Sequence, residues 1–150
     1  MARQPITVLI LEDNLDDALL LTETLTSSDE IQTKVFHAQR LEKALEMAET
    51  IIPDVAILDL HLPDSYGLDT FLTFYKQHPQ IPVIIMSGIN DLETALCAVQ
   101  HGAQDYISKG EPSVATITRT IRYAMERHRL ITHLESTKRT LQTALEQSTI

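Results

Sequence analysis

The sequence lacks the features that mark several large classes of protein. Cys97 is the only cysteine among 150 residues, so no intrachain disulfide can form. Apolar stretches are short and interrupted by charged residues, which predicts no membrane span. The first apolar run, residues 6–11, continues directly into Glu12 and Asp13 without a small-residue cleavage site, which argues against a secretory signal. We therefore expect a cytoplasmic protein with no membrane partner.

Internal repeats and low-complexity linkers are also absent. The composition, with 43% hydrophobic and 22% charged residues, is that of a globular protein rather than a disordered or fibrous one. A length of 150 residues is enough to bury one hydrophobic core. These properties predict one globular domain.

Basic residues are scarce in the first part of the chain. Residues 1–110 carry 6 Lys and Arg against 17 Asp and Glu, a net charge of −11, whereas residues 111–150 carry 6 against 4, a net charge of +2. An acidic body argues against nucleic acid as a direct partner, because the phosphate backbone would repel it. The same charge is compatible with a bound divalent cation.

What the sequence does contain is an alternation of short apolar segments and helical patterns. The short segments are rich in β-branched residues and are bounded by polar or turn residues, which predicts strands. The five predicted strands are residues 6–11, 33–38, 55–60, 81–87 and 104–108. Apolar residues at helical spacing follow Asn14 and Gly67, recur in residues 41–50, and precede Gly102. A last helix is predicted to begin near Pro112 and Ser113.

Five successive β-then-α units predict an α/β fold with one parallel sheet and helices on both faces. Each right-handed crossover must be long enough to hold a helix. Strands that are buried on both faces should be continuously apolar, as residues 8–11 and 82–86 are. In doubly wound folds of this kind, ligands bind beyond the carboxyl ends of the strands. Functional residues are therefore expected at those ends.

Chemically active side chains follow or end four of the five predicted strands. In chain order they are Glu12 and Asp13, then Asp59, then Ser87, then Lys109. If the first and third strands are neighbours, three carboxylates meet at one edge of the sheet and repel one another unless a cation is present. Mg²⁺ suits such hard oxygen ligands. Lys109 adds a positive charge and Ser87 a hydroxyl donor, so this set could hold a phosphoryl group on Asp59.

Each of these residues also has a simpler explanation. Glu12 and Asp13 alone fit a strand end and a helix start. Ser87 alone fits a turn, and Lys109 alone fits a solvated surface charge. Asp59 alone is evenly balanced between a turn residue and a functional carboxylate. Their joint occurrence at the ends of four strands is what favours a phosphoryl-transfer site.

Four segments occur in the order and at the separations typical of one family. They are "LILEDN" at 9–14, "ILDLHLPDSYG" at 57–67, "IIMSG" at 84–88 and "GAQDYISKG" at 102–110. Ser87 lies 28 residues after Asp59, and Lys109 lies 50 residues after it. Over residues 5–125 the chain resembles the receiver domain of two-component response regulators, of the chemotaxis-regulator kind. The resemblance implies a flavodoxin-like sheet with strand order 2-1-3-4-5 and a phosphorylation-dependent signalling switch.

The resemblance also implies roles for the residues at the strand ends. Asp59 would accept a phosphoryl group from a sensor histidine kinase or a phosphotransfer protein. Glu12, Asp13 and Asp59 would bind Mg²⁺, and the backbone carbonyl of His61 would complete the protein ligands. Such a protein catalyses only its own phosphoryl transfer and dephosphorylation and is not otherwise an enzyme.

By the same resemblance, a conformational switch follows phosphorylation. Ser87 and Lys109 would bind the phosphoryl oxygens, and Ser87 would move toward them. Tyr106, three residues before the lysine, would then turn inward and remodel the face made by the fourth helix, the fifth strand and the fifth helix. The alternative for Tyr106 is an aromatic ring that simply packs at the edge of the sheet.

Three features depart from the common receiver pattern. Lys109 is followed by Gly110 where receivers commonly have a cis proline, so a cis bond is not assumed here. The acidic pair is Glu-Asp rather than Asp-Asp, which leaves open whether Glu12 contacts the metal directly or through water. His61 and Ile89 lie where side chains can affect the access of water to the acyl phosphate, although we expect His61 to be solvated.

Other classes of protein share parts of this pattern. A haloacid-dehalogenase-like phosphatase also uses an aspartate at a strand end with Mg²⁺, but it needs a second acid two residues later, where this chain has His61. A flavin-binding domain needs a phosphate-binding loop after the first strand, where "EDNLDD" would repel phosphate. The strongest alternative is a receiver-like interaction module that is not phosphorylated.

The end of the chain is longer than a receiver needs. Neither Gly nor Pro occurs from Ser113 to Ser148, which predicts one helix of about 36 residues, roughly 54 Å long. A receiver domain over residues 1–125 cannot cover a helix of that length. Residues 126–150 are therefore expected to project as a helical extension.

Apolar residues recur along this extension at heptad-like spacing. We call them the C-terminal seam: Ile131, Leu134, Leu141 and Leu145, with Lys138 at the intervening position. Such a seam predicts a homodimer through a parallel coiled coil, or a linker to a further domain. The alternative is a frayed, solvated tail, because two heptads with one lysine inside make a weak coiled coil.

Overall fold

The computed structural model describes residues 4–110 and 113–148. Five parallel strands form one sheet in the order β2-β1-β3-β6-β7. The strands are β1 (Ile6–Leu11), β2 (Thr33–Ala38), β3 (Val55–Asp59), β6 (Val83–Ser87) and β7 (Asp105–Ser108). Counted along the chain, these strands have the predicted order 2-1-3-4-5, so the flavodoxin-like fold is confirmed.

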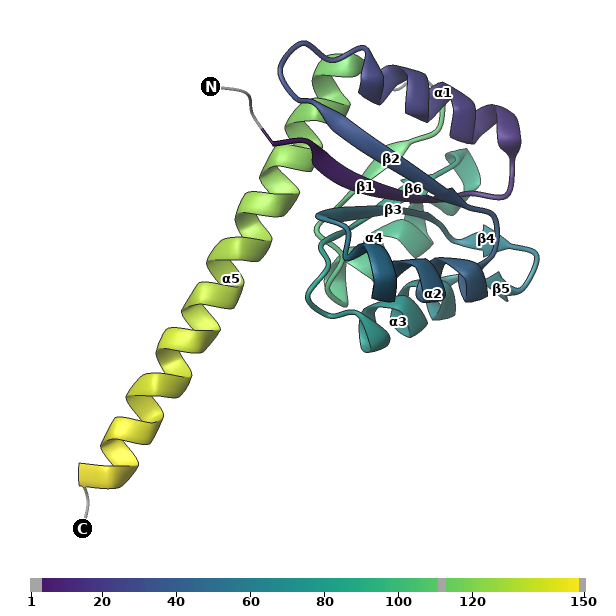
Figure 1. The fold of residues 1–150 in the computed structure, drawn as a ribbon. Helices are drawn as coiled ribbons and strands as arrows, with labels where there is room; N and C mark the ends of the chain where they lie inside the picture. The colour runs from purple at the N-terminus through teal and green to yellow at the C-terminus, as the bar shows by residue number, and fades with distance from the viewer. Residues whose placement is uncertain (1–3, 111–112, 149–150) are drawn as a thin grey trace.

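Helices cover both faces of the sheet (Figure 1). One face is covered by α1 (Leu15–Thr26) and the first part of α5 (Val114–Ser148). The other face is covered by α2 (Leu41–Ile51), α3 (Leu68–Gln77) and α4 (Leu92–Gln100). Of the two residues near which the last helix is predicted to begin, Pro112 lies outside the described residues and Ser113 directly precedes α5, which is helical from Val114 onward.

The central strands place apolar side chains on both faces of the sheet. In β1, Val8 and Ile10 pack in the cluster that contains α1 and α5, whereas Leu9 and Leu11 pack in the cluster that contains α2, α3 and α4. All four side chains are fully buried. Because side chains alternate along a strand, a continuously apolar strand buries a hydrophobic residue on each face of the sheet.

A short hairpin follows β3 that the sequence patterns did not predict. Its strands, β4 (His61–Leu62) and β5 (Ser65–Tyr66), pair antiparallel at the carboxyl end of the sheet (Figure 1). At its turn, the Asp64 carboxylate accepts hydrogen bonds from the backbone N–H groups of Leu41 at 2.9 Å and Glu42 at 3.1 Å. Arg40, the residue before α2, makes no side-chain cap bond. Asp64 therefore caps α2 from a distant part of the chain.

We predict that Asp64→Ala lowers the free energy of unfolding by about 1 kcal/mol, the usual worth of a helix cap. Burial acts to raise the pKa of Asp64, but the N–H groups of Glu42 and Leu41 outweigh it and hold that pKa below its ordinary value. The stabilisation is therefore present above the unfolded-state pKa, about 3.9, and is lost as the pH falls through the lower folded-state pKa.

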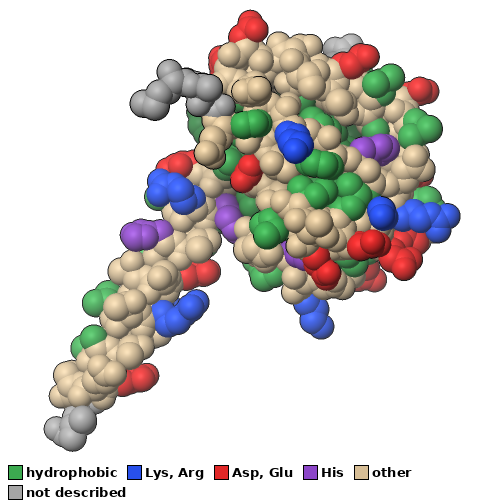
Figure 2. Space-filling model, viewed as in Figure 1, with side chains coloured by type: hydrophobic (Ala, Val, Ile, Leu, Met, Phe, Trp, Pro, Cys, Tyr) green, Lys and Arg blue, Asp and Glu red, His purple; other side chains and the backbone are tan. Residues whose placement is uncertain are grey.

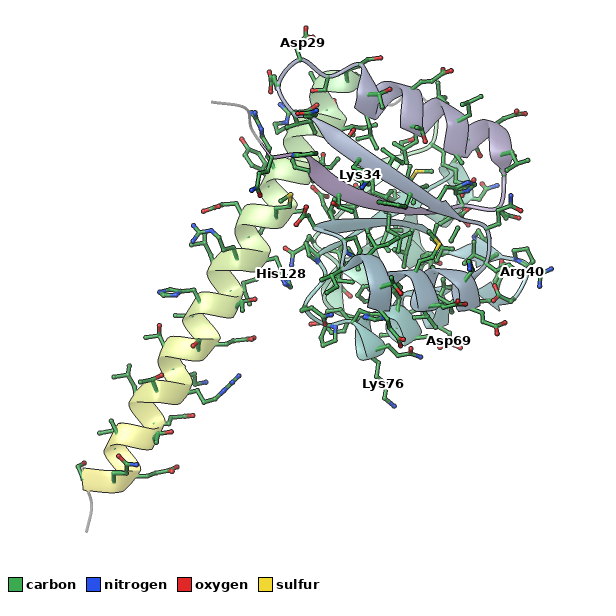
Figure 3. All side chains as sticks on the ribbon, in the orientation of Figure 1. Asp29, Lys34, Arg40, Asp69, Lys76 and His128 are labelled. Carbon is green, nitrogen blue, oxygen red and sulfur yellow. The ribbon has the colours of Figure 1, made fainter. Side chains whose placement is uncertain are left out.

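Urea unfolding at pH 7 and near pH 3 measures this difference. The exposed Asp29, labelled in Figure 3, provides the matched control, since Asp29→Ala removes a carboxylate that caps no helix. An equal loss of stability for Asp64→Ala at both pH values would contradict the cap.

Helix α5 is one continuous helix of 35 residues, as the sequence predicts. Ile117, Ile121 and Ala124 are buried against the sheet, and every side chain from Arg129 to Ser148 is exposed. The helix leaves the body at the edge where the strands begin, and its second half projects away from it (Figure 1). None of the helices in residues 4–110 and 113–148 combines the length and hydropathy needed to cross a membrane.

Candidate phosphorylation site

The predicted site residues come together at the carboxyl edge of the sheet. Glu12 follows β1, Asp59 ends β3, Ser87 ends β6 and Lys109 follows β7. The register places β1 between β2 and β3, so the first and third strands are neighbours as the prediction required. In Figure 3 this edge lies on the side of the molecule marked by Arg40, which stands between β2 and α2.

Three carboxylates form a compact cluster at this edge. One oxygen each from Glu12, Asp13 and Asp59 lies within 4.8 Å of the others. Glu12 and Asp59 are buried, whereas Asp13 is exposed and keeps the cluster open to solvent. Lys109 Nζ donates to Asp59 Oδ2 at 2.6 Å and to Glu12 Oε1 at 2.9 Å. The predicted convergence of the carboxylates and the lysine is thus present in the structure.

Asp17 also belongs to this charge cluster, although it is not among the predicted site residues. Its Oδ2 atom lies 3.6 Å from Lys109 Nζ, and the residue is in the first turn of α1. An acidic residue at a helix start is so common that position alone carries little information about a site. Asn14, the residue before α1, caps the helix by accepting the N–H of Asp17.

Burial and proximity separate the pKa values of the two buried carboxyls. Burial, followed by the hydrogen bond with Asp59, raises the pKa of Glu12 to about 9, despite the opposing effect of Lys109. Burial also acts to raise the pKa of Asp59, but hydrogen bonds from Glu12, Lys109 and the His61 N–H outweigh it and lower that pKa. The two pKa values therefore move in opposite directions, and Asp59 is the carboxyl of the pair that ionises first.

Lys109 responds to the same contacts. Burial acts to lower the pKa of its ammonium, but the hydrogen bonds to Asp59 and Glu12 outweigh burial and raise it. Lys109 therefore keeps its positive charge at any physiological pH.

The donor set fits a divalent cation. Glu12 Oε2 is buried and no donor from the described residues reaches it, so only a proton of its own or a cation can satisfy it. Three carboxylate oxygens, one of them open to solvent, match the preference of Mg²⁺ for hard oxygen ligands with some waters retained. The His61 main chain lies against the same cluster, since its N–H donates to Asp59 Oδ1 at 3.0 Å.

The two predicted switch residues lie on neighbouring strands. Ser87 is buried, and its carbonyl accepts the backbone N–H of Lys109 at 3.0 Å, which ties the ends of β6 and β7 together. Tyr106 is opposite Ile85 in the β6–β7 register, and 36% of its surface is exposed. The ring is therefore not buried in the core in this conformation.

The expectation that His61 is solvated is wrong. Its Nε2 atom lies 2.7 Å from Asp91 Oδ1, and its ring is stacked on Tyr66 at a centroid distance of 4.4 Å. The unpredicted hairpin explains this difference, because β4 and β5 place His61 opposite Tyr66. Ile89, by contrast, lies two residues after Ser87 and is 96% exposed.

Comparisons with known proteins identify the family. A model of the response regulator receiver domain matches residues 8–122. The KDP operon transcriptional regulatory protein KdpE of Escherichia coli is 34% identical over 121 residues, which cover 81% of this chain and 52% of KdpE. The DNA-binding transcriptional regulator NtrC of Proteus hauseri is 32% identical over 122 residues, which cover 79% of this chain and 25% of NtrC.

The fold agrees with these sequence matches. The crystal structure of the receiver domain of NtrX from Brucella abortus has a TM-score of 0.70 at 30% identity and covers 79% of this chain and 98% of that domain. The fold and the acidic edge thus define a phosphorylation-linked signalling domain. The chain belongs to the receiver-domain family of two-component response regulators. It spans about half the length of KdpE and a quarter of NtrC.

Proposed function

We propose that this chain accepts a phosphoryl group on Asp59 from a sensor histidine kinase or a phosphotransfer protein, with Mg²⁺ held by Glu12, Asp13, Asp59 and the His61 carbonyl. One observation carries the proposal: a buried, ionised Asp59 lies 2.6 Å from Lys109 and beside a Glu12 oxygen that has no donor among the described residues. A buried carboxylate held in this way is both a nucleophile and a place where added negative charge is tolerated.

The residues of the site divide the work of the transfer. An Asp59 oxygen attacks phosphorus, so that the P–N bond of the donor histidine breaks as the P–O bond forms. The His61 N–H holds Asp59 Oδ1 and Lys109 holds Oδ2, which fixes the carboxylate for attack. Bound Mg²⁺ supplies positive charge that offsets the charge of the transferring group. Lys109 shares that task and remains next to the product.

The switch follows from the new charge at Asp59. A phosphoryl group adds negative charge and strong acceptor oxygens, to which the Ser87 hydroxyl and the Lys109 ammonium donate. Movement of Ser87 gives the half-exposed Tyr106 ring space to turn inward. Tyr106 lies on β7, which contacts both α4 and α5, so burial of its ring would change the outer surface of those elements.

The direct test is to incubate the chain with Mg²⁺ and acetyl phosphate, and separately with beryllofluoride. One base-labile acyl phosphate per chain, and a beryllofluoride-dependent change in the tyrosine spectrum, support the proposal. No labelling and no spectral change would favour the interaction module that is not phosphorylated. Continued turnover of phosphomonoesters would instead indicate a phosphatase.

Further properties are proposed for the chain as given. We infer that it catalyses only its own phosphorylation and dephosphorylation and that it acts in the cytoplasm. We also infer that it does not bind nucleic acid directly, since residues 1–110 carry a net charge of −11. DNA binding is stated in the name of NtrC, of which this chain spans 25%. A gel-shift assay with mixed-sequence DNA at low salt tests the inference.

A homodimer through the extension, residues 126–150, completes the proposal. The seam residues Ile131, Leu134, Leu141 and Leu145 are 48%, 68%, 60% and 66% exposed. Figure 2 shows hydrophobic side chains along the projecting helix among polar ones. A second copy of the same helix would cover them at the a and d positions of a parallel coiled coil. Lys138, inside the seam, limits the affinity of that dimer.

We predict that truncation after Arg129 weakens the dimer by at least about tenfold, because it removes the whole seam. Light scattering over a concentration series, with and without beryllofluoride, measures the mass. The full-length double variant Leu134→Lys/Leu141→Lys should act like the truncation. The matched control, Ser136→Lys/Thr143→Lys, adds equal charge on the opposite side of the helix and should leave the dimer intact. Equal monomer masses for the full and truncated chains at high concentration would refute the dimer.

A further inference from the structure

A side-chain bond joins the two loops that border the phosphorylation site. His61, in β4, lies 2.7 Å from Asp91, the last residue of the short 3₁₀ helix η1 (Ile89–Asp91). A carboxylate can only accept, so Nε2 of His61 carries the hydrogen and donates it to Asp91 Oδ1. The bond therefore connects the loop after Asp59 to the loop after Ser87.

The orientation of the His61 ring depends on few contacts. Its Nδ1 atom is buried and has no hydrogen-bond partner in the described part of the chain. The ring of Tyr66 packs against the His61 ring at a centroid distance of 4.4 Å with the planes tilted by 35°, and Asp91 accepts the one side-chain hydrogen bond that the His61 ring makes among the described residues. Removing Asp91 would thus leave the direction of the ring without a hydrogen bond to fix it.

Asp91 occupies a position where aspartate normally does something else. It is the residue before α4, and aspartate is among the preferred caps of a helix start. Asn14 makes such a bond at the start of α1, where its side chain accepts the N–H of Asp17 at 3.1 Å. Asp91 makes no cap bond to α4, and its Oδ1 lies at hydrogen-bond distance from His61 instead.

The second carboxylate oxygen of Asp91 lies close to the switch residue. A Cβ built on Gly88 would lie 3.4 Å from Asp91 Oδ2, so this carboxylate packs over the residue that follows Ser87. The Asp91 N–H also donates to the Gly88 carbonyl at 3.1 Å. Gly88, which is bonded in the chain to Ser87, is thus in contact with Asp91 through both the main chain and the side chain of Asp91.

We propose that the Asp91 carboxylate is a two-position latch that restrains the phosphorylation switch. In the first position the Asp91 carboxylate is bonded to His61 and holds the loop between β6 and α4. In the second position, which it takes when that loop moves, the carboxylate caps the start of α4. This inference rests on the proposed function, since the movement it restrains is that of Ser87. Asp91 is a positioning residue, because it acts on the site through His61 and Gly88.

The two positions are close enough in energy for such a latch. The side chains of His61 and Asp91 are 31% and 30% exposed, so water weakens their bond to the range of a partly exposed pair. A helix cap has a similar worth. Two alternative bonds of similar strength allow a small change at Ser87 to decide between them.

The test is a double-mutant cycle on the affinity for beryllofluoride in the presence of Mg²⁺, measured by titration of the tyrosine NMR signals. His61→Phe keeps the ring on Tyr66 but removes the donor, so the switch should bind beryllofluoride roughly threefold more tightly. Asp91→Ala removes both the bond to His61, which opposes the switch, and the later cap on α4, which favours it. The two losses offset each other, so the affinity for beryllofluoride should change little. In the His61→Phe background, Asp91→Ala loses only the cap and should weaken binding roughly threefold.

The difference between the two backgrounds is the signature of the latch. Glu93→Ala, which removes an exposed carboxylate from the first turn of α4, is the matched control and should have the same small effect in both backgrounds. An Asp91→Ala effect that is identical in the two backgrounds would overturn the proposal, because independent residues add.

A second measurement separates this inference from the proposed function. Amide exchange at Glu93 and Thr94, which a cap on α4 would protect, should slow in His61→Phe and recover in His61→Phe/Asp91→Ala, without any phosphoryl analogue. If the wild-type protein fails to bind beryllofluoride, the proposed function is refuted. Amide exchange at Glu93 and Thr94 still shows whether Asp91 moves from His61 to the start of α4. Unchanged exchange in His61→Phe would refute it.

Discussion

Asp59→Asn is expected to reduce phosphoryl incorporation from acetyl phosphate to background while the fold is retained. An amide nitrogen cannot replace the carboxylate oxygen as nucleophile. Asp59 Oδ2 is 2.6 Å from Lys109 Nζ, and the other described carboxylates near this lysine, those of Glu12 and Asp17, are farther from it. Radiolabelled incorporation measures the loss, and the far-ultraviolet circular dichroism spectrum reports the fold. Phosphate incorporation that persists in this variant would show that Asp59 is not the acceptor.

The matched control is Asp69→Asn at the exposed first turn of α3 (Figure 3), which changes one acid to its amide far from the cluster. It should incorporate phosphate as the wild-type chain does. A loss in both variants would indicate a general defect rather than the removal of the acceptor.

The Asp59→Asn variant should also alter how stability without Mg²⁺ depends on pH. The folded-state pKa of Glu12, about 9, lies above its ordinary value of 4.5, so folding takes up a proton between these pH values and stability falls as the pH rises through that window. The amide introduced by Asp59→Asn carries no charge, so it would no longer raise the pKa of Glu12 by repulsion. For each unit by which the folded-state pKa of Glu12 falls, the free energy of unfolding near pH 9 rises by roughly 1.4 kcal/mol. Urea unfolding from pH 5 to 9 should therefore show a flatter profile and equal or higher stability at pH 8.

Lys109→Ala has the second large expected effect. Mg²⁺ binding at the carboxylates should largely remain, but beryllofluoride should no longer change the environment of Tyr106, because no ammonium draws the phosphoryl oxygens toward β7. Without Mg²⁺ the variant should also be less stable, by about 3 kcal/mol, since Glu12 and Asp59 lose their buried partner. Tyrosine NMR and urea unfolding measure the two effects, and Mg²⁺ should restore much of the stability.

Two variants sharpen this result. Lys76→Ala removes an exposed lysine from α3 (Figure 3) and should change neither quantity. Lys109→Arg keeps the charge and should retain more stability than Lys109→Ala. A full response of Tyr106 to beryllofluoride in Lys109→Ala would show that Lys109 is not part of the switch.

The sequence could predict the sheet because the information was local. Short runs of β-branched residues and the helical spacing between them are sufficient for a doubly wound fold, and a parallel sheet then brings its strand ends to one edge. Glu12, Asp59 and Lys109 therefore met as predicted, although they are far apart in the chain. The length of α5 was also predictable, since a segment without Gly or Pro contains nothing to end a helix.

Other features depend on contacts that local patterns do not encode. The β4–β5 hairpin has strands of two residues, too short for alternation to be detected. The solvation of His61 was wrongly expected because its partner, Asp91, lies 30 residues away. An aspartate directly before a helix, such as Asp91, predicts a helix cap. In the structure its carboxylate makes no cap bond and contacts His61 instead.

Because α5 is a single helix, a small tilt at its base is enlarged at its projecting end. Arg127 Nη1 donates to the Gln104 carbonyl at 3.2 Å, just before β7, and this is close to the point where the helix leaves the body. The exposed part, residues 129–148, is roughly 30 Å long at 1.5 Å per residue. A tilt of about 5° at the Arg127 contact would thus displace the tip of the helix by roughly 3 Å. A rearrangement around Tyr106 that is too small to alter the sheet can therefore reach a distant partner as a movement of atomic size.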